Sequence, residues 1–180
     1  MTHEEIKNWL DKYNVENYTI RPDGIVDVDN DVNLRNFKGT TLPVQFGEVS
    51  GHFDMFGTNI TSLVGFPVFI GRDFICSGCK NLTSIKYAPR FIGGGFYIHD
   101  TSIKSLTGVD KVIKHISGMC WCDEKVTHIL GLLLIKGITD FNIDNGGPID
   151  KIMKKYAGTG DILSAQDELI DAGFIDQARL

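Results

Sequence analysis

The four cysteines are the residues whose types and spacing most directly suggest chemistry. Cys76 and Cys79 form a Cys-x-x-Cys pair, and Cys120 and Cys122 form a Cys-x-Cys pair. Four thiolates are a common ligand set for a structural zinc ion. An internal repeat, described below, argues against such a site, because it places Cys76 at an inward position and Cys120 at an outward one. We therefore expect no metal and no cofactor, and we interpret the cysteines as reduced thiols of a cytoplasmic protein.

An alternating acidic segment is the second candidate for chemistry. Asp27, Asp29, Asp31 and Asn33 stand at every second position, as do the first ligands of a calcium-binding EF-hand loop. Counted from Asp27, the sixth and twelfth positions hold Val and Lys, whereas that loop requires Gly and Glu. The segment instead predicts a strand edge with solvent-facing acids, and weak calcium binding is the alternative.

Serine and histidine are the residues that would build a hydrolytic site. Ser62, Ser84 and Ser105 occupy equivalent positions of the repeat, so their recurrence predicts packing or turn hydrogen bonds. A histidine-assisted nucleophile assembled from distant units stays open as an alternative, but no residue is singled out for it. We expect that the protein is not an enzyme.

These residues are positioned by an internal repeat. Each unit begins with an apolar residue, a variable residue and a second apolar residue, which places two side chains on one face of a short strand. A single unit cannot bury these side chains, but stacked units form a continuous core. The first apolar residues follow one another at steps of 21, 21, 22, 23 and 22 residues, at Val32, Phe53, Phe74, Phe96, Met119 and Phe141.

Both ends are expected to be helical, because an uncapped end unit of a solenoid exposes its core. Thr2 and Glu5 have the spacing of a capping box, and Trp9 lies on the apolar face of the helix that follows. The C-terminal segment predicts helices over Ile149–Tyr156 and Asp161–Ala172, either as a cap or as a separate partner-binding element. The predicted units are residues 1–17 for the capping helix, 18–144 for about six repeats and 145–180 for the helical pair.

The stretch LTSIKYAPRFIGGGF, residues 82–96, resembles the short leucine-rich repeats of bacterial and bacteriophage proteins. The resemblance covers about Tyr18 to Ile143. It implies an α+β fold, a short leucine-rich-repeat-like β-solenoid of parallel strands. It also implies a phage-encoded accessory protein that binds and modulates a host or phage protein, with inhibition of a host-defence factor as one version. The usual turn Asn is Thr58 and Thr101 here, so we expect hydroxyls to replace its hydrogen bonds. In the irregular fifth unit we expect a helical return through Ile129–Ile135.

The outward side of the strands is the candidate binding site. Equivalent side chains on successive parallel strands lie about 4.7–4.9 Å apart, so Phe56, Ile75, Tyr97 and His99 are expected to form one patch. An apolar and aromatic patch with an acidic rim is typical of a protein-binding surface. The residues that we assign to this site are Asp54, Phe56, Asp73, Ile75, Tyr97, His99, Asp100 and Asp123.

Composition and charge argue against other partners. The net charge is −5 and the Lys and Arg residues are scattered, which disfavours nucleic acid. No apolar run is long enough to span a membrane, and the first residues do not resemble a secretion signal. We therefore expect a protein partner in the cytoplasm, that of the host bacterium if the chain is phage-encoded. The alternative is a structural or assembly role, in which the apolar tail Phe174–Leu180 and the terminal strands pair between copies.

Overall fold

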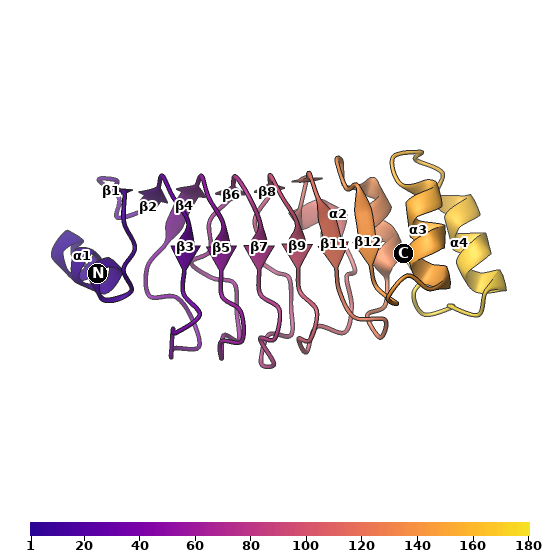
Figure 1. The fold of residues 1–180 in the computed structure, drawn as a ribbon, viewed down its shortest axis with the longest axis horizontal. Coiled ribbons are helices and arrows are strands. Elements are labelled where there is room, and N and C mark those ends of the chain that lie inside the picture. Colours follow the sequence, from indigo (N-terminus) through magenta and orange to yellow (C-terminus); the bar gives the residue numbers. More distant parts are fainter.

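The chain folds as a β-solenoid of stacked coils with helices at both ends (Figure 1). The computed structural model describes residues 1–180. The strands form two six-stranded sheets, in which every pairing is parallel except that of the first two strands. The predicted α+β class and the predicted solenoid of parallel strands are therefore confirmed.

One sheet contains the strands that the repeat predicts, and we call it the repeat sheet. It consists of β3 (Val32–Asn33), β5 (Phe53–Asp54), β7 (Phe74–Ile75), β9 (Phe96–Tyr97), β11 (Met119–Trp121) and β12 (Asp140–Asn142). The other, which we call the return sheet, consists of β1 (Tyr18–Ile20), β2 (Val26–Val28), β4 (Phe46–Val49), β6 (Phe69–Ile70), β8 (Phe91–Ile92) and β10 (His115–Ile116). The helices are α1 (His3–Lys12), α2 (Val109–Val112), the 3-10 helix η1 (Ile129–Leu134), α3 (Pro148–Tyr156) and α4 (Ile162–Asp171).

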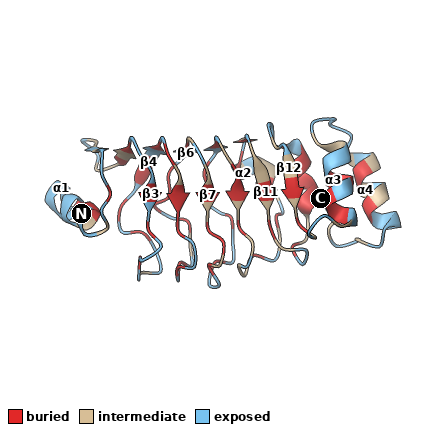
Figure 2. Ribbon diagram, viewed as in Figure 1, coloured by how far each residue is buried: buried red, intermediate tan, exposed pale blue.

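The core lies between the two sheets and runs the length of the solenoid (Figure 2). Phenylalanine rings from successive coils form its centre. The ring of Phe53 lies 5.2 Å from that of Phe46 and 5.1 Å from that of Phe66, and Phe74 stacks on Phe96 at 5.5 Å between centroids. Aromatic pairs in this range add to the free energy gained by burial. The stacking confirms that single coils share one continuous core.

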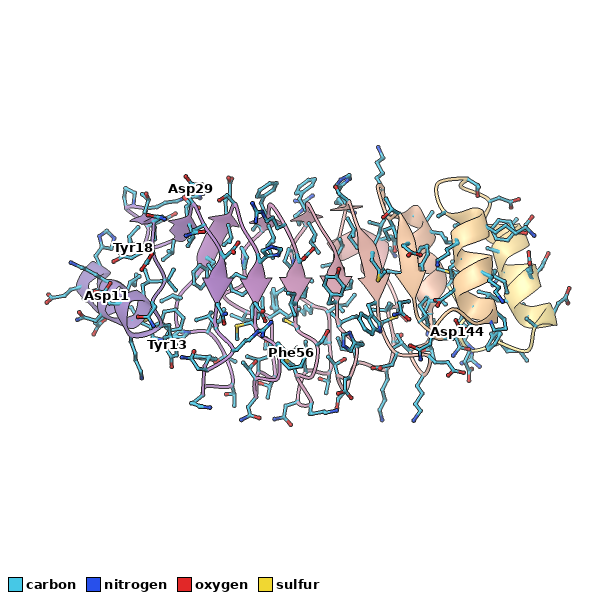
Figure 3. The ribbon with its side chains drawn as sticks, in the orientation of Figure 1. Asp11, Tyr13, Tyr18, Asp29, Phe56 and Asp144 are labelled. Carbon is cyan, nitrogen blue, oxygen red and sulfur yellow. The ribbon has the colours of Figure 1, made fainter.

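Carboxylates tie successive coils together at their edges. Asp27 accepts a hydrogen bond from the Glu48 amide at 2.9 Å, and Asp31 accepts one from the His52 amide at 2.8 Å. Asp29 lies on the side of the solenoid opposite Phe56 (Figure 3). The predicted strand edge is confirmed, with its valines buried and its acids turned outward. No group of three or more His, Cys, Asp or Glu side chains is arranged to hold a metal ion.

The fifth coil corrects our assignment of its register. Cys120 lies opposite Phe96, and Trp121 lies opposite Tyr97. Both Cys120 and Cys122 are therefore buried in the core, so the prediction that Met119 is the first core residue of this coil and that Cys120 points outward is wrong. The physical reason is that a buried thiol behaves as a small hydrophobe, which lets the larger indole take the outward position.

The helices close the ends of the solenoid as predicted. The capping box of Thr2 and Glu5 is present at α1, and the partly buried Trp9 packs against aromatic rings of the first coils. At the other end, the buried carboxylate of Asp150 accepts from the Ile143 amide at 2.7 Å and fixes α3 to the end of β12. Asp144, beside α3 in Figure 3, accepts from the amide of the second helical residue at 2.8 Å. No helix has the length and apolar character needed to cross a membrane.

A pair of phenylalanine substitutions tests the shared core. Phe74 is 0% exposed, whereas Phe56, on the preceding coil, is 48% exposed. We expect Phe74→Ala to lower the free energy of unfolding by about 3–5 kcal/mol through the cavity it leaves. Phe56→Ala should lower it by about 1 kcal/mol or less. Urea titration followed by circular dichroism measures both, and equal effects would contradict the assignment of Phe74 to the core.

Candidate functional site

The outward face of the repeat sheet consists of two columns of side chains, one residue from each coil. The register of the strands fixes both columns. The first column is Asn33, Asp54, Ile75, Tyr97, Trp121 and Asn142. The second, two residues later in each coil, is Arg35, Phe56, Ser77, His99 and Asp123.

The centre of this face is a cluster of rings that we call the aromatic shelf, made by Tyr97, Trp121 and His99 with Ile75 beside them. His99 stacks on Trp121 with the ring centroids 3.9 Å apart and the planes 23° apart. The Tyr97 ring meets Trp121 edge-on at 6.4 Å. All four residues are half-buried, so each ring is held by its neighbours while one side stays accessible. Three of them belong to the predicted site, and the structure brings them together.

Trp121 is the site residue that the sequence reasoning missed. The error follows from the register of the fifth coil, because taking Met119 as its first core residue placed Trp121 inward. A signal was present: Cys120 precedes Phe141 by 21 residues, the step that separates Val32 from Phe53 and Phe53 from Phe74.

A buried hydroxyl fixes the orientation of the His99 ring. Ser77, which is 1% exposed, lies with its Oγ 2.9 Å from Nδ1 of His99. Burial lowers the pKa of His99 below its ordinary value of 6.5, and the nearby carboxylates of Asp123 and Asp100 oppose this shift. The ring is therefore mostly neutral near pH 7, and it presents an aromatic surface rather than a charge.

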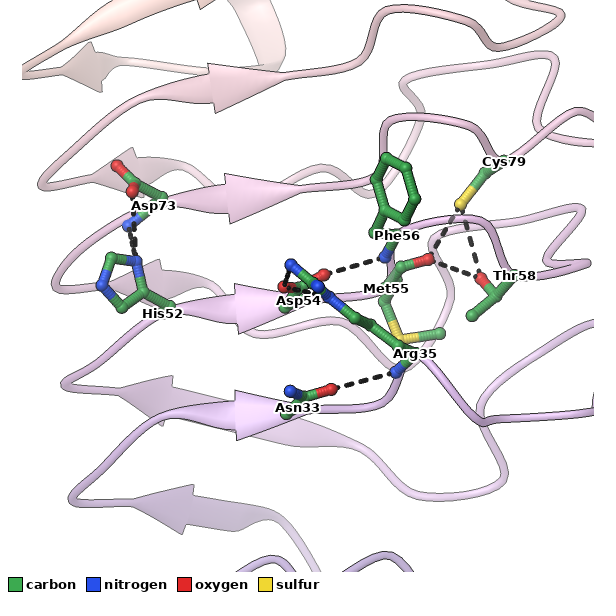
Figure 4. A network of polar contacts seen from close by, with 9 residues as sticks. All are labelled: Asn33, Arg35, His52, Asp54, Met55, Phe56, Thr58, Asp73 and Cys79. Atoms are coloured by element: carbon green, nitrogen blue, oxygen red, sulfur yellow. Dashed lines mark hydrogen bonds and ion pairs between the residues drawn. The ribbon is translucent and has the colours of Figure 1, made fainter.

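Phe56 and its polar neighbours form the other end of the face (Figure 4). The Arg35 guanidinium lies 5.5 Å from the Phe56 ring centroid and 2.7 Å from the Asp54 carboxylate. Asp54 also accepts from the Phe56 amide at 2.9 Å and is only 7% exposed. Of these predicted site residues, Phe56 is accessible to a partner, whereas the contacts of Asp54 are made within the chain.

The three rim acids of the predicted site also make contacts between coils. Asp73 accepts from the Gly95 amide at 2.7 Å and pairs with the His52 ring. Asp100 forms an ion pair with Lys80, and its amide donates to the Asp123 carboxylate at 2.9 Å. These carboxylates surround the aromatic shelf, but each one also stabilises the stack.

The turn that follows the second column is held by side-chain donors, as predicted. The hydroxyls of Thr58 and Thr101 donate to backbone carbonyls at 2.9 Å. In the coil between them the equivalent residue is Cys79. Its thiol donates to the Met55 carbonyl of the preceding coil at 3.1 Å. A hydrogen bond from Cys76 lowers the pKa of Cys79 to about 7, and burial raises that of Cys76 well above its ordinary value. Both thiols are buried.

An open hollow of about 960 Å³ adjoins the aromatic shelf. His99 and Trp121 form its apolar side, and Lys104, Lys125 and Glu124 are among the polar residues around it. Ser105, also in its lining, lies with its Oγ 3.2 Å from Nδ1 of His128. No carboxylate hydrogen-bonds to this pair, so the third member of a catalytic triad is missing here.

The C-terminal tail, expected to pair between copies, packs largely on its own chain. Phe174 is half-buried and Ala178 is 2% exposed. The amides of His128 and Ile129 each donate to tail carbonyls at 3.1 Å. Of the tail's large apolar side chains, Ile175 and Leu180 are exposed. Deleting the tail would therefore disturb the last coil and cannot test self-association cleanly.

Protonation of His99 should destabilise the folded protein. Because burial holds its pKa below 6.5, the unfolded state binds more protons as the pH falls below about 6.5. The contribution of His99 to stability is thus present above that pH and is lost as the pH falls through the folded-state pKa. An NMR titration of the His99 ring should give a pKa below 6.5. Trp121→Ala should raise this pKa toward 6.5 by exposing the ring, and an unchanged pKa would contradict the role of the stack.

Comparison of the chain with protein-family models, with curated proteins and with solved structures gives no match. A function must therefore be argued from the chemistry of the site itself.

Proposed function

We propose that the chain is a non-enzymatic protein-binding module that uses the aromatic shelf as the centre of its interface. The observation that carries the proposal is the contiguous set of Tyr97, Trp121 and His99, held by stacking and by the buried Ser77 hydroxyl. Trp and Tyr are over-represented among the residues that dominate protein interfaces. Rings that are already fixed lose little conformational entropy when a partner binds.

The charge around the shelf favours a protein over a nucleic acid. Asp100, Asp123 and Glu124 outnumber Lys104 and Lys125 among the charged residues that line the adjoining hollow, and the chain as a whole has a net charge of −5. Phosphate groups would be repelled by these carboxylates. A protein segment with an apolar side chain for the shelf and a basic residue for the rim satisfies both features.

We extend the proposal to the biological setting that the sequence resemblance suggests. Residues 82–96 resemble the short leucine-rich repeats of bacteriophage proteins, and stacked coils with a side-chain surface are what such proteins use to bind partners. The partner is then a host or phage protein in the bacterial cytoplasm, and a host-defence factor is one version. The resemblance supports this setting, and the shelf supports the mode of binding.

Substitutions on the two sheets test the proposal. We expect Trp121→Ala and Tyr97→Ala each to weaken partner binding by about 2 kcal/mol or more, about 30-fold in Kd. The double variant Tyr97→Ala with Phe56→Ala should abolish capture of the partner from bacterial cells, with the thermal melt lowered by only a few degrees, about 5 °C or less. The partner identified by mass spectrometry is then titrated by calorimetry.

A matched control lies on the return sheet. Phe69 is 40% exposed and comparable in size to the shelf rings, so Phe69→Ala removes a similar exposed surface and should leave the Kd unchanged. The proposal is wrong if capture survives the double variant, or if Phe69→Ala weakens binding as much as Trp121→Ala does.

A further inference from the structure

The return sheet exposes an apolar surface that its own chain does not cover. Phe69 and Phe91 stand at paired positions of β6 and β8 and are 40% and 42% exposed. Val68 precedes Phe69 and is 50% exposed, and Leu134, 51% exposed, lines a hollow together with Phe91. We call these four residues the phenylalanine strip. Contiguous exposed apolar side chains of this size mark interaction surfaces.

Unpaired cations surround the phenylalanine strip. Arg90, Lys114 and Lys136 are exposed, and none of them forms an ion pair within the chain. Lys114 donates only to the Asp110 carbonyl, at 2.7 Å. The side chains of Asp110 and His115 also line the hollow, and Glu48 precedes Phe69 in the same column. On a chain of net charge −5, this is a local surplus of positive charge beside apolar surface.

The outer face of α4 has the complementary character. Leu163, Asp167, Ile170 and Asp171 are spaced i, i+4, i+7 and i+8, so they lie on one side of the helix. All four are exposed, Leu163 at 70% and Ile170 at 44%. Neither aspartate forms an ion pair, whereas the neighbouring Glu168 forms one with Lys155. The opposite side of α4 is buried against α3 and η1, so the outer face has no partner within its own chain.

We propose that α4 of one copy docks on the phenylalanine strip of a second copy. Leu163 and Ile170 then pack along the phenylalanine strip, and the two aspartates of α4 meet the cations beside the strip. Figure 1 places α4 at the far end of the solenoid from α1, away from β6 and β8, so the contact forms between copies. Two such contacts related by a two-fold axis close a dimer.

The dimensions of the two surfaces agree. From Phe69 the column passes through Phe91 and His115 to Lys136, with each residue paired to the next. Three steps between parallel strands cover about 14 Å. The eight steps from Leu163 to Asp171 rise about 12 Å along a helix. A helix laid across the strands can therefore place Leu163 over the phenylalanines, with Ile170 and Asp171 toward the end of the column at Lys136.

The contact would leave the other sheet free. The aromatic shelf lies on the repeat sheet, so a dimer built through the return sheet leaves both shelves accessible. This inference goes beyond the proposed function and does not depend on it. Self-association also arises here from surfaces other than the tail and terminal strands that the sequence suggested.

Concentration-dependent mass measurement tests the proposal. Light scattering and sedimentation equilibrium of the full chain, from low to several hundred micromolar, should show a shift from the 20.0 kDa monomer toward twice that mass. Phe69→Ser with Phe91→Ser, and Leu163→Ser with Ile170→Ser, should each weaken dimerisation at least tenfold. Phe56→Ser on the repeat sheet is the matched control and should leave it unchanged.

A charge exchange distinguishes this contact from any other association. Lys114→Glu with Lys136→Glu, and Asp167→Lys with Asp171→Lys, should each give a folded monomer, with folding checked by circular dichroism. In a dimer of one copy of each variant, both phenylalanine strips again face an α4 helix of opposite charge. Mixing the two variants should therefore restore the dimer. A wild-type chain that stays monomeric at all concentrations overturns the proposal. So does a dimer that survives both charge variants, or a mixture of the two folded variants that remains monomeric.

Discussion

The structure depends on one constraint, the hydrogen-bonded register between successive coils. The amide of Phe53 donates to the Asp73 carbonyl, and that of Phe74 to the Gly95 carbonyl, both at 2.9 Å. Strands of two residues form too few such bonds to hold a sheet by themselves, so the stacked rings between the sheets must supply most of the stability. The close stacking also restricts the corners, because a Cβ on Gly93 would collide with the backbone carbonyl of Gly71 on the coil before it.

The register determines which side chains are neighbours on the surface. Each coil contributes one residue to each outward column, so neighbours in a column are about 21–24 residues apart in the sequence. Tyr97 and Trp121 are neighbours on β9 and β11 although 24 residues separate them. The two sheets are therefore independent surfaces, one with a fixed aromatic shelf and acidic rim, the other with exposed phenylalanines and cations.

The same constraint explains which features the sequence could predict. Large apolar residues at the first core position made the solenoid recognisable, because only a bulky hydrophobe fills that site in most coils. The register of the fifth coil was missed because Cys120 fills it with a small side chain beside a more conspicuous Trp121. The return sheet was not recognised as a sheet because it exposes Phe69 and Phe91, which breaks the usual pattern of polar residues outside. Asp54 accepts from the Phe56 amide two residues later, and Asp73 accepts from the Gly95 amide of the next coil. These contacts could not be predicted from the residue types alone.

The C-terminal helices show how capping and interaction can reside in one element. A cap needs an apolar inner side and a polar outer side, and α3 together with the inner side of α4 meets the first requirement with Ile149, Ala165 and Leu169 fully buried. The second requirement is not met, because Leu163 is 70% exposed on the outer side. An exposed leucine and isoleucine at helical spacing, interleaved with unpaired aspartates, therefore need a reason outside the monomer, and the return sheet of a second copy has the apolar and basic surface that would provide it.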